Sequence, residues 1–168
     1  LGLTDALTGV HNRRYFEHRC QVEISQARRH RYPLCCMFID VDRFKLFNDA
    51  HGPAVGDEVL KALSAQLLQT LGERADLMRL GEDEFAILLV APDTQVAAHQ
   101  LTDDIQTVLT QPLTLSAPST LVVPDSTLPL AVLSSAMLTF SLPSTRPSAT
   151  GVTVIVRLEV SVFTPSLT

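Results

Sequence analysis

The sequence predicts an α/β (α+β) domain whose central sheet contains antiparallel strands and is flanked by helices. Residues 34–39 form an uninterrupted apolar run, as expected of a strand that is buried on both faces. Residues 76–91 contain two apolar segments around a polar turn, which predicts a β-hairpin. Amphipathic segments alternate with these strands, an order that suits a sheet with helices packed on it.

Three segments carry apolar residues at helical spacing, and they cover residues 11–32, 55–71 and 94–110. The first is followed by Pro33 and by the strand predicted at 34–42. Residues 44–58 are polar and contain glycine, so we expect a loop there. The predicted order is therefore helix, strand, loop, helix, hairpin and helix.

Bulk properties narrow the class of protein. The chain has 168 residues, 46% of them hydrophobic, which is enough for one domain with a buried core. Its net charge of −5 predicts no binding of nucleic acid. No apolar run approaches the roughly 20 residues that span a membrane, so we expect no membrane contact by this segment. Three cysteines without metal-ligand spacing indicate reduced core thiols and a cytoplasmic location. The first residue is Leu1, so we expect a piece of a longer protein.

The composition changes after Gln111. Residues 112–168 hold only four charged side chains, and 26 of these 57 residues are Ser, Thr or Pro. We therefore divide the chain into a core, residues 1–111, and an atypical C-terminal part of the same domain, residues 112–168. Residues 121–123 and 153–163 have strand-like sequences. A shifted reading frame and a divergent tail both explain the change, and the sequence leaves both open.

The most unusual stretch is RLGEDEF at residues 79–85, which places Glu82, Asp83 and Glu84 in a row at the predicted hairpin turn. Adjacent carboxylates repel one another, and a divalent cation relieves the repulsion. Asp40, at the end of the strand before, would complete a Mg²⁺ site if it met Asp83 on a neighbouring strand, because Mg²⁺ often takes one or two carboxylates plus phosphate oxygens. The alternative is an acidic turn that is only solvated.

Three segments carry a family resemblance: DALTGVHNRRYF (5–16), FIDVDRFKLFNDAHGPAVGDEVL (38–60) and RLGEDEFAILL (79–89). In order and separation they resemble the successive blocks of the GGDEF domain, the diguanylate cyclase family, and the match extends over residues 1–111. The resemblance implies a palm-like sheet similar to that of nucleotide cyclases. It also implies a head-to-tail homodimer that joins two GTP into cyclic di-GMP with Mg²⁺ (or Mn²⁺).

The resemblance also assigns metal and catalytic roles by motif position. Asp40 and Asp83 would bind the metal together with the backbone carbonyl of Val41. Glu84 would lie beside the metal and the attacking hydroxyl, as a charge stabiliser or a base.

Substrate contacts follow from the second block. Lys45 would hold terminal phosphate oxygens together with the backbone amides of Arg43 and Phe44. This contact would give Lys45 both a substrate-binding and a catalytic role. Asn48 and Asp57 would read the guanine edge. Turn formation is the alternative role for Asn48. Arg13 and Arg14, in the first block, are assigned to the helix surface or a dimer contact rather than to catalysis.

Several departures from the family bear on activity. Glu82 stands where the family has the second glycine of its signature, which predicts a strained turn and extra negative charge beside the triphosphate. Pro53 stands where the family has a histidine. Arg74 and Asp76 are too close together in the sequence for the family's product-inhibition motif, so we expect no inhibitory site. The basic C-terminal block is missing, with no lysine after Lys61.

These departures favour weak activity at best, and they keep a second function open. The alternative is a degenerate GGDEF regulatory module that binds GTP or a partner domain without catalysis. Residues 95–115 resemble the version of the domain that precedes an EAL phosphodiesterase domain, so a sensory or EAL domain is the expected neighbour in the full-length protein.

Overall fold

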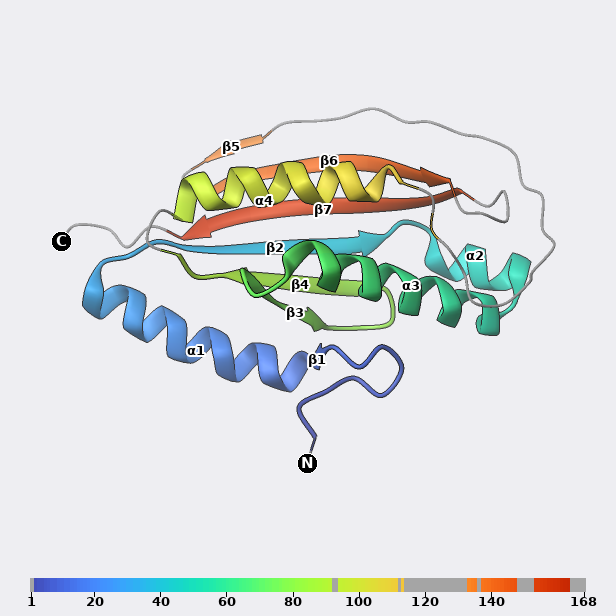
Figure 1. The fold of residues 1–168 in the computed structure, drawn as a ribbon, viewed down its shortest axis with the longest axis horizontal. Helices are drawn as coiled ribbons and strands as arrows, with labels where there is room; N and C mark the ends of the chain where they lie inside the picture. The colour runs from blue at the N-terminus through green and yellow to red at the C-terminus, as the bar shows by residue number, and fades with distance from the viewer. Residues whose placement is uncertain are drawn as a thin grey trace.

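The computed structural model describes residues 2–91, 94–111, 113, 133–135, 137–147 and 153–163. Seven strands form one sheet in the order β1-β3-β4-β2-β7-β6-β5 (Figure 1). The strands are β1 (His11–Asn12), β2 (Leu34–Val41), β3 (Ala75–Arg79), β4 (Glu84–Leu89), β5 (Leu133–Ser135), β6 (Met137–Pro147) and β7 (Thr153–Phe163). The helices are α1 (Arg13–His30), α2 (Phe44–His51), α3 (Pro53–Leu71) and α4 (Thr94–Leu109).

The sheet confirms the predicted fold class. β2 lies at its centre, antiparallel to β4 on one side and to β7 on the other. β3 and β4 form the predicted antiparallel hairpin, and only the β1–β3 pair is parallel among the described strands. The expected strand at 153–163 is β7, whereas the strand-like run at 121–123 lies outside the described residues. The division at residue 111 stays a prediction.

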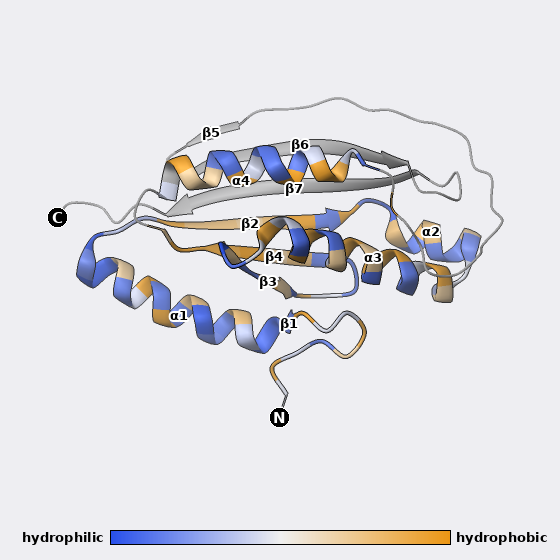
Figure 2. Ribbon diagram, in the orientation of Figure 1, coloured by the Kyte–Doolittle hydropathy of each residue, from blue (hydrophilic) through white to orange (hydrophobic). Residues whose placement is uncertain are grey.

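Two hydrophobic clusters lie on opposite faces of the sheet. Alternate residues of β2 (Cys35, Met37, Ile39 and Val41) join residues of α3 and α4 in the larger cluster. Cys36 belongs with α1 to the smaller cluster around Met78, Ala86 and Leu88. Accordingly, β2 and β4 are hydrophobic over most of their length (Figure 2). No described helix has the length and apolar character needed to cross a membrane.

The prediction of a loop at residues 44–58 is wrong. This stretch forms α2 and the first turns of α3, with only Gly52 between the two helices. Gly52 has a φ of 88°, which ends α2, and its N–H donates to the carbonyl of Asn48 at 2.8 Å. Pro53 is the first residue of α3, where proline is favoured because its missing N–H would have no helical partner. Glycine and proline therefore cap two helices here instead of forming a loop.

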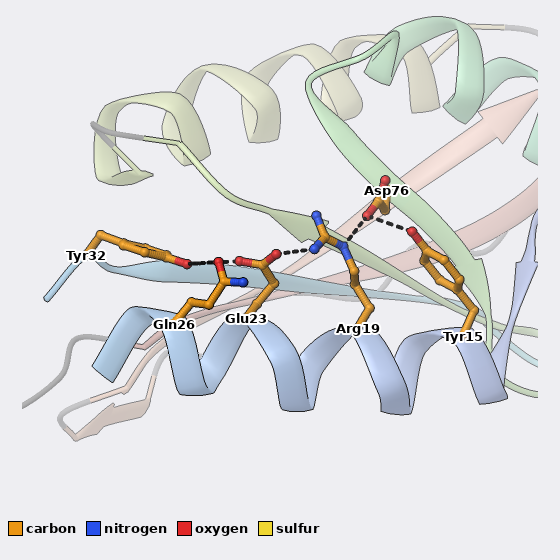
Figure 3. Close-up of polar contacts among 6 residues, drawn as sticks. All are labelled: Tyr15, Arg19, Glu23, Gln26, Tyr32 and Asp76. Atoms are coloured by element: carbon orange, nitrogen blue, oxygen red, sulfur yellow. Dashed lines mark hydrogen bonds and ion pairs between the residues drawn. The ribbon is translucent and has the colours of Figure 1, made fainter. Parts of the chain in front are cut away.

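α1 is held to β3 by a polar network on its inner side (Figure 3). Arg19 pairs with Glu23 one turn on, and its Nε donates to Asp76 Oδ2 at 3.1 Å. The hydroxyl of Tyr32 donates to Glu23 Oε2 at 3.0 Å, and that of Tyr15 donates to Asp76 at 3.4 Å. Glu23 is only 4% exposed, so its charge depends on these partners.

Candidate functional site

The end of β2 meets the hairpin turn, which we call the signature turn (residues 80–83). Asp40 is paired in register with Glu84, the first residue of β4. The N–H of Val41 donates to the carbonyl of Asp83 at 3.2 Å, and the N–H of Leu80 donates to the carbonyl of Glu84 at 2.8 Å. The fold thus brings the carboxylate-bearing end of β2 beside the acidic turn, as the sequence predicts; the metal and catalytic roles of these residues stay predictions.

The carboxylate of Asp83 carries charge that the protein compensates only in part. Burial raises the pKa of Asp83, and the neighbouring charges of Glu84 and Glu82 raise it further, while Arg79 opposes them. No three Asp, Glu, His or Cys side chains of the described residues converge as a metal-binding group. A site built here therefore needs further oxygen ligands from outside the side chains, and phosphate oxygens meet that need.

The signature turn does not carry the backbone strain expected at Glu82. Among the described residues other than glycine, positive φ occurs at Arg31 and Arg43 and not at Glu82. Glu82 is exposed, and its carbonyl accepts a hydrogen bond from Arg79 Nη2 at 2.8 Å. The glycine at this position of the family signature is therefore not required by the backbone here, and the remaining effect of Glu82 is its negative charge.

Arg79 also ties the signature turn to the N-terminal segment. Its Nη1 lies 2.9 Å from Asp5 Oδ1. Burial raises the pKa of Asp5, but hydrogen bonds from Thr8 and the guanidinium of Arg79 outweigh it and leave this pKa below its usual value. The charged pair is therefore the stable form at neutral pH.

The N-terminus of α2 follows directly after β2 and offers an anion-binding end. Arg43 precedes the helix in the left-handed region, with a φ of 55°, and gives the helix no side-chain cap. Arg43 itself therefore does not cap the first backbone N–H groups of α2, and a helix N-terminus favours an anion. Lys45, the second residue of the helix, is exposed beside them, and Phe44 is buried in the core. The strained Arg43 fixes the turn from the strand to this helix.

A close approach between α2 and α3 surrounds Asn48. Its Oδ1 is buried and has no hydrogen-bond partner among the described residues. A Cβ at Gly56 would lie only 1.8 Å from that oxygen, so any residue larger than glycine would displace the amide. Asp57, the next residue, is exposed. The requirement for glycine at 56 was missed at the sequence level, because it depends on a contact between two helices.

Arg74 and Asp76 do not form a joint site. Arg74 donates to Asp104 at 2.7 Å and to the carbonyls of Thr70 and Leu71, on the side of α3 and α4. Asp76 is held by Arg19 and Tyr15 of α1, on the other face (Figure 3). The two side chains are thus engaged on opposite faces of the sheet, and the expected lack of an inhibitory site stays a prediction.

Comparison with known proteins identifies the family. The sequence model described as "Diguanylate cyclase, GGDEF domain" matches residues 3–122. The chain is 40% identical over 116 residues to diguanylate cyclase TpbB of Pseudomonas aeruginosa, which covers 69% of this chain and 27% of the relative. It is 42% identical over 85 residues to probable diguanylate cyclase DgcC of Escherichia coli, covering 51% and 23%. The chain thus spans about a quarter of the length of these relatives.

A solved structure gives the same result. The isolated GGDEF domain of TpbB from Pseudomonas aeruginosa superposes with a TM-score of 0.65 at 30% identity, over 95% of this chain and 73% of that one. The chain therefore belongs to the GGDEF domain family.

Proposed function

We propose that this chain is a diguanylate cyclase domain that condenses two GTP into cyclic di-GMP. In each half-reaction the 3′-oxygen of one GTP forms a bond to the α-phosphorus of the other, and the bond from that phosphorus to the bridging oxygen of pyrophosphate breaks. The hydroxyl proton is lost as the bond forms, and two pyrophosphates leave per product. The observation that carries the proposal is the meeting of β2 and the signature turn, with Val41 bonded to Asp83 and Asp40 paired with Glu84.

Asp40, Asp83 and the carbonyl of Val41 would hold Mg²⁺ or Mn²⁺. The oxygen-only donor set and the raised pKa of Asp83 suit a hard divalent cation. Such an ion, when bound, neutralises phosphate charge and aligns the attacking and leaving oxygens. Glu84 would accept the proton of the attacking hydroxyl or stabilise the charge that develops there.

The triphosphate would lie at the start of α2. The N–H groups at the start of α2 and the exposed ammonium of Lys45 would be the donors for its terminal oxygens. The same helix carries Asn48 one turn further on, so phosphate and base would be bound by a single element. A negative charge at Glu82 and the lack of lysine after Lys61 oppose triphosphate binding and predict a weak enzyme.

Asn48 and Asp57 would recognise guanine. Oδ1 of Asn48 has no hydrogen-bond partner among the described residues, and its amide would gain one by turning from Gly56 toward a bound base. Asp57 would accept hydrogen bonds from the ring N–H and exocyclic amine, which adenine lacks. Gly56 would keep the space that this arrangement needs.

The partners follow from the reaction. Each domain would bring one GTP, so catalysis would need a head-to-tail homodimer, and a sensory or EAL domain would accompany it in the full-length protein. We propose a cytoplasmic location, because GTP is the substrate. The second candidate, a module that binds GTP or a partner domain without turnover, is favoured by Glu82, by Pro53 and by the missing basic C-terminal block.

Incubation of the purified chain with GTP and Mg²⁺ tests the proposal. Chromatography should detect cyclic di-GMP and pyrophosphate with the parent and neither with Asp40→Asn. Binding of GTP without product would support the non-catalytic module, and absence of both would reject both functions for this chain.

A further inference from the structure

One arginine outside the predicted site contacts both sides of the signature turn. Arg13 is the first residue of α1. Its Nε donates to the carbonyl of Leu80 at 2.7 Å, and its Nη2 lies 3.9 Å from Glu84 Oε2. Leu80 directly follows β3 and Glu84 begins β4, so a single guanidinium contacts both strands at the turn end of the hairpin. A planar group with several fixed donors is suited to such a bridge.

The position of the Glu84 carboxylate depends on little else in the described structure. A Cβ at Gly81 would lie 3.3 Å from Glu84 Oε2, so this side chain folds back over the glycine. Its side chain is 55% exposed, which leaves it free to turn toward solvent unless a partner holds it. Arg13, whose side chain is 60% exposed, is the cation that the structure pairs with that carboxylate.

The neighbouring residue provides a contrast. Arg14 is exposed and makes no hydrogen bond or ion pair with the part of the chain that is described. The two arginines therefore carry the same charge, lie in the same helix turn and are both exposed, but only Arg13 contacts the signature turn. Helix-surface solvation explains Arg14, but it does not explain a 2.7 Å bond from Arg13 to a residue 67 positions away.

We propose that Arg13 is a positioning residue for the reaction, an inference that rests on the function proposed above. It fixes the Leu80 carbonyl and holds the Glu84 carboxylate in the orientation from which Glu84 acts on the attacking hydroxyl. Because Arg13 starts α1, it also connects the N-terminal segment to the reacting end of the sheet. A group that acts through Glu84 affects turnover more than it affects GTP binding.

Steady-state kinetics of Arg13→Ala, Arg13→Lys and Arg14→Ala test this role. Misplacement of a catalytic group lowers turnover steeply, so we expect kcat of Arg13→Ala to fall about tenfold while KM for GTP changes less than about twofold. Arg13→Lys keeps the charge without the planar fork and should recover only part of kcat. Arg14→Ala should match the parent. Equal kcat values for Arg13→Ala and Arg14→Ala would overturn the proposal.

Amide hydrogen exchange provides a readout that needs no activity. The N–H groups of Leu80 and Val41 close the signature turn, so loss of the Arg13 bridge should speed their exchange while amides in the centre of β2 remain unchanged. Unchanged rates at Leu80 and Val41 in Arg13→Ala would overturn the proposal, even if the parent makes no product and the cyclase assignment itself fails. If Arg13→Ala does not fold, Arg13→Lys and Arg14→Ala give the same comparison.

Discussion

Replacing Glu82 separates the two effects that this residue could have, backbone strain and charge. A residue held in the left-handed region costs about 1–3 kcal/mol, which glycine would relieve. Glu82 has no positive φ, so this relief is not available. Glycine instead increases the conformational freedom of the unfolded chain, and Glu82→Gly should lose about 0.4–1 kcal/mol of stability. For a chain of this size the melting temperature should fall by about 1–4 °C.

The charge effect should appear in GTP binding. Two unit charges 4 Å apart in water interact by about 1 kcal/mol, which corresponds to an improvement of about fivefold in KM for GTP. Glu82→Gln removes the charge and keeps the side chain, so it is the matched control. Both variants should improve KM by a similar factor, and the gain should shrink at high salt.

Melting curves and initial rates of the parent, Glu82→Gly and Glu82→Gln decide between the two effects. We expect similar kinetics for both variants and lower stability for Glu82→Gly only. A Glu82→Gly protein that is more stable than the parent by over about 1 kcal/mol would refute the reasoning, because strain of that size would then exist at this turn.

Three further predictions concern other charged groups. Because the pKa of Asp83 is raised in the folded protein, ionising this group at neutral pH costs folding free energy. Without metal, Asp83→Asn should therefore melt at a higher temperature than the parent at neutral pH, and the difference should close as the pH falls toward the ordinary pKa of 3.8. Mg²⁺ with GTP should raise the melting temperature of the parent and not that of the variant. Arg19→Met leaves buried Glu23 with Tyr32 alone, so the free energy of unfolding in urea should fall by about 1–3 kcal/mol. Adding Glu23→Met should recover part of this loss. A loss under about 0.5 kcal/mol would argue against the network. Cyclic di-GMP added at the start of the assay should leave the initial rate unchanged, since Arg74 and Asp76 are engaged on opposite faces; inhibition that Arg74→Ala removes would contradict this.

Local patterns predicted the parts of the fold that depend on local sequence. The apolar run at 34–39 became β2, because a strand with a cluster on each face needs apolar residues at successive positions. The helices α1 and α4 begin and end within about two residues of their predicted bounds, a normal uncertainty for helix ends. At 44–58 the prediction was wrong, because Gly52 and Pro53 suit a loop and a junction of two helices equally well.

The site was only partly accessible from sequence. The meeting of Asp40 with the signature turn follows from the pairing of β2 with β4, which could be stated from the sequence only as a condition. The bridge from Arg13 to Leu80 and the fit of Asn48 against Gly56 depend on how helices pack, and no local pattern encodes them. No signal in the sequence indicated the second contact, because Gly56 lies where the predicted loop at 44–58 meets the predicted helix at 55–71, and glycine is ordinary at such a place.

The central claim is that the end of β2 and the signature turn form a centre that joins two GTP. The most direct measurement is product formation by the purified chain with GTP and Mg²⁺, comparing the parent with Asp83→Asn at a pH where both are folded. We expect slow formation of cyclic di-GMP by the parent and none by the variant. Equal product from both proteins, or none from a folded parent that still binds GTP, would contradict it.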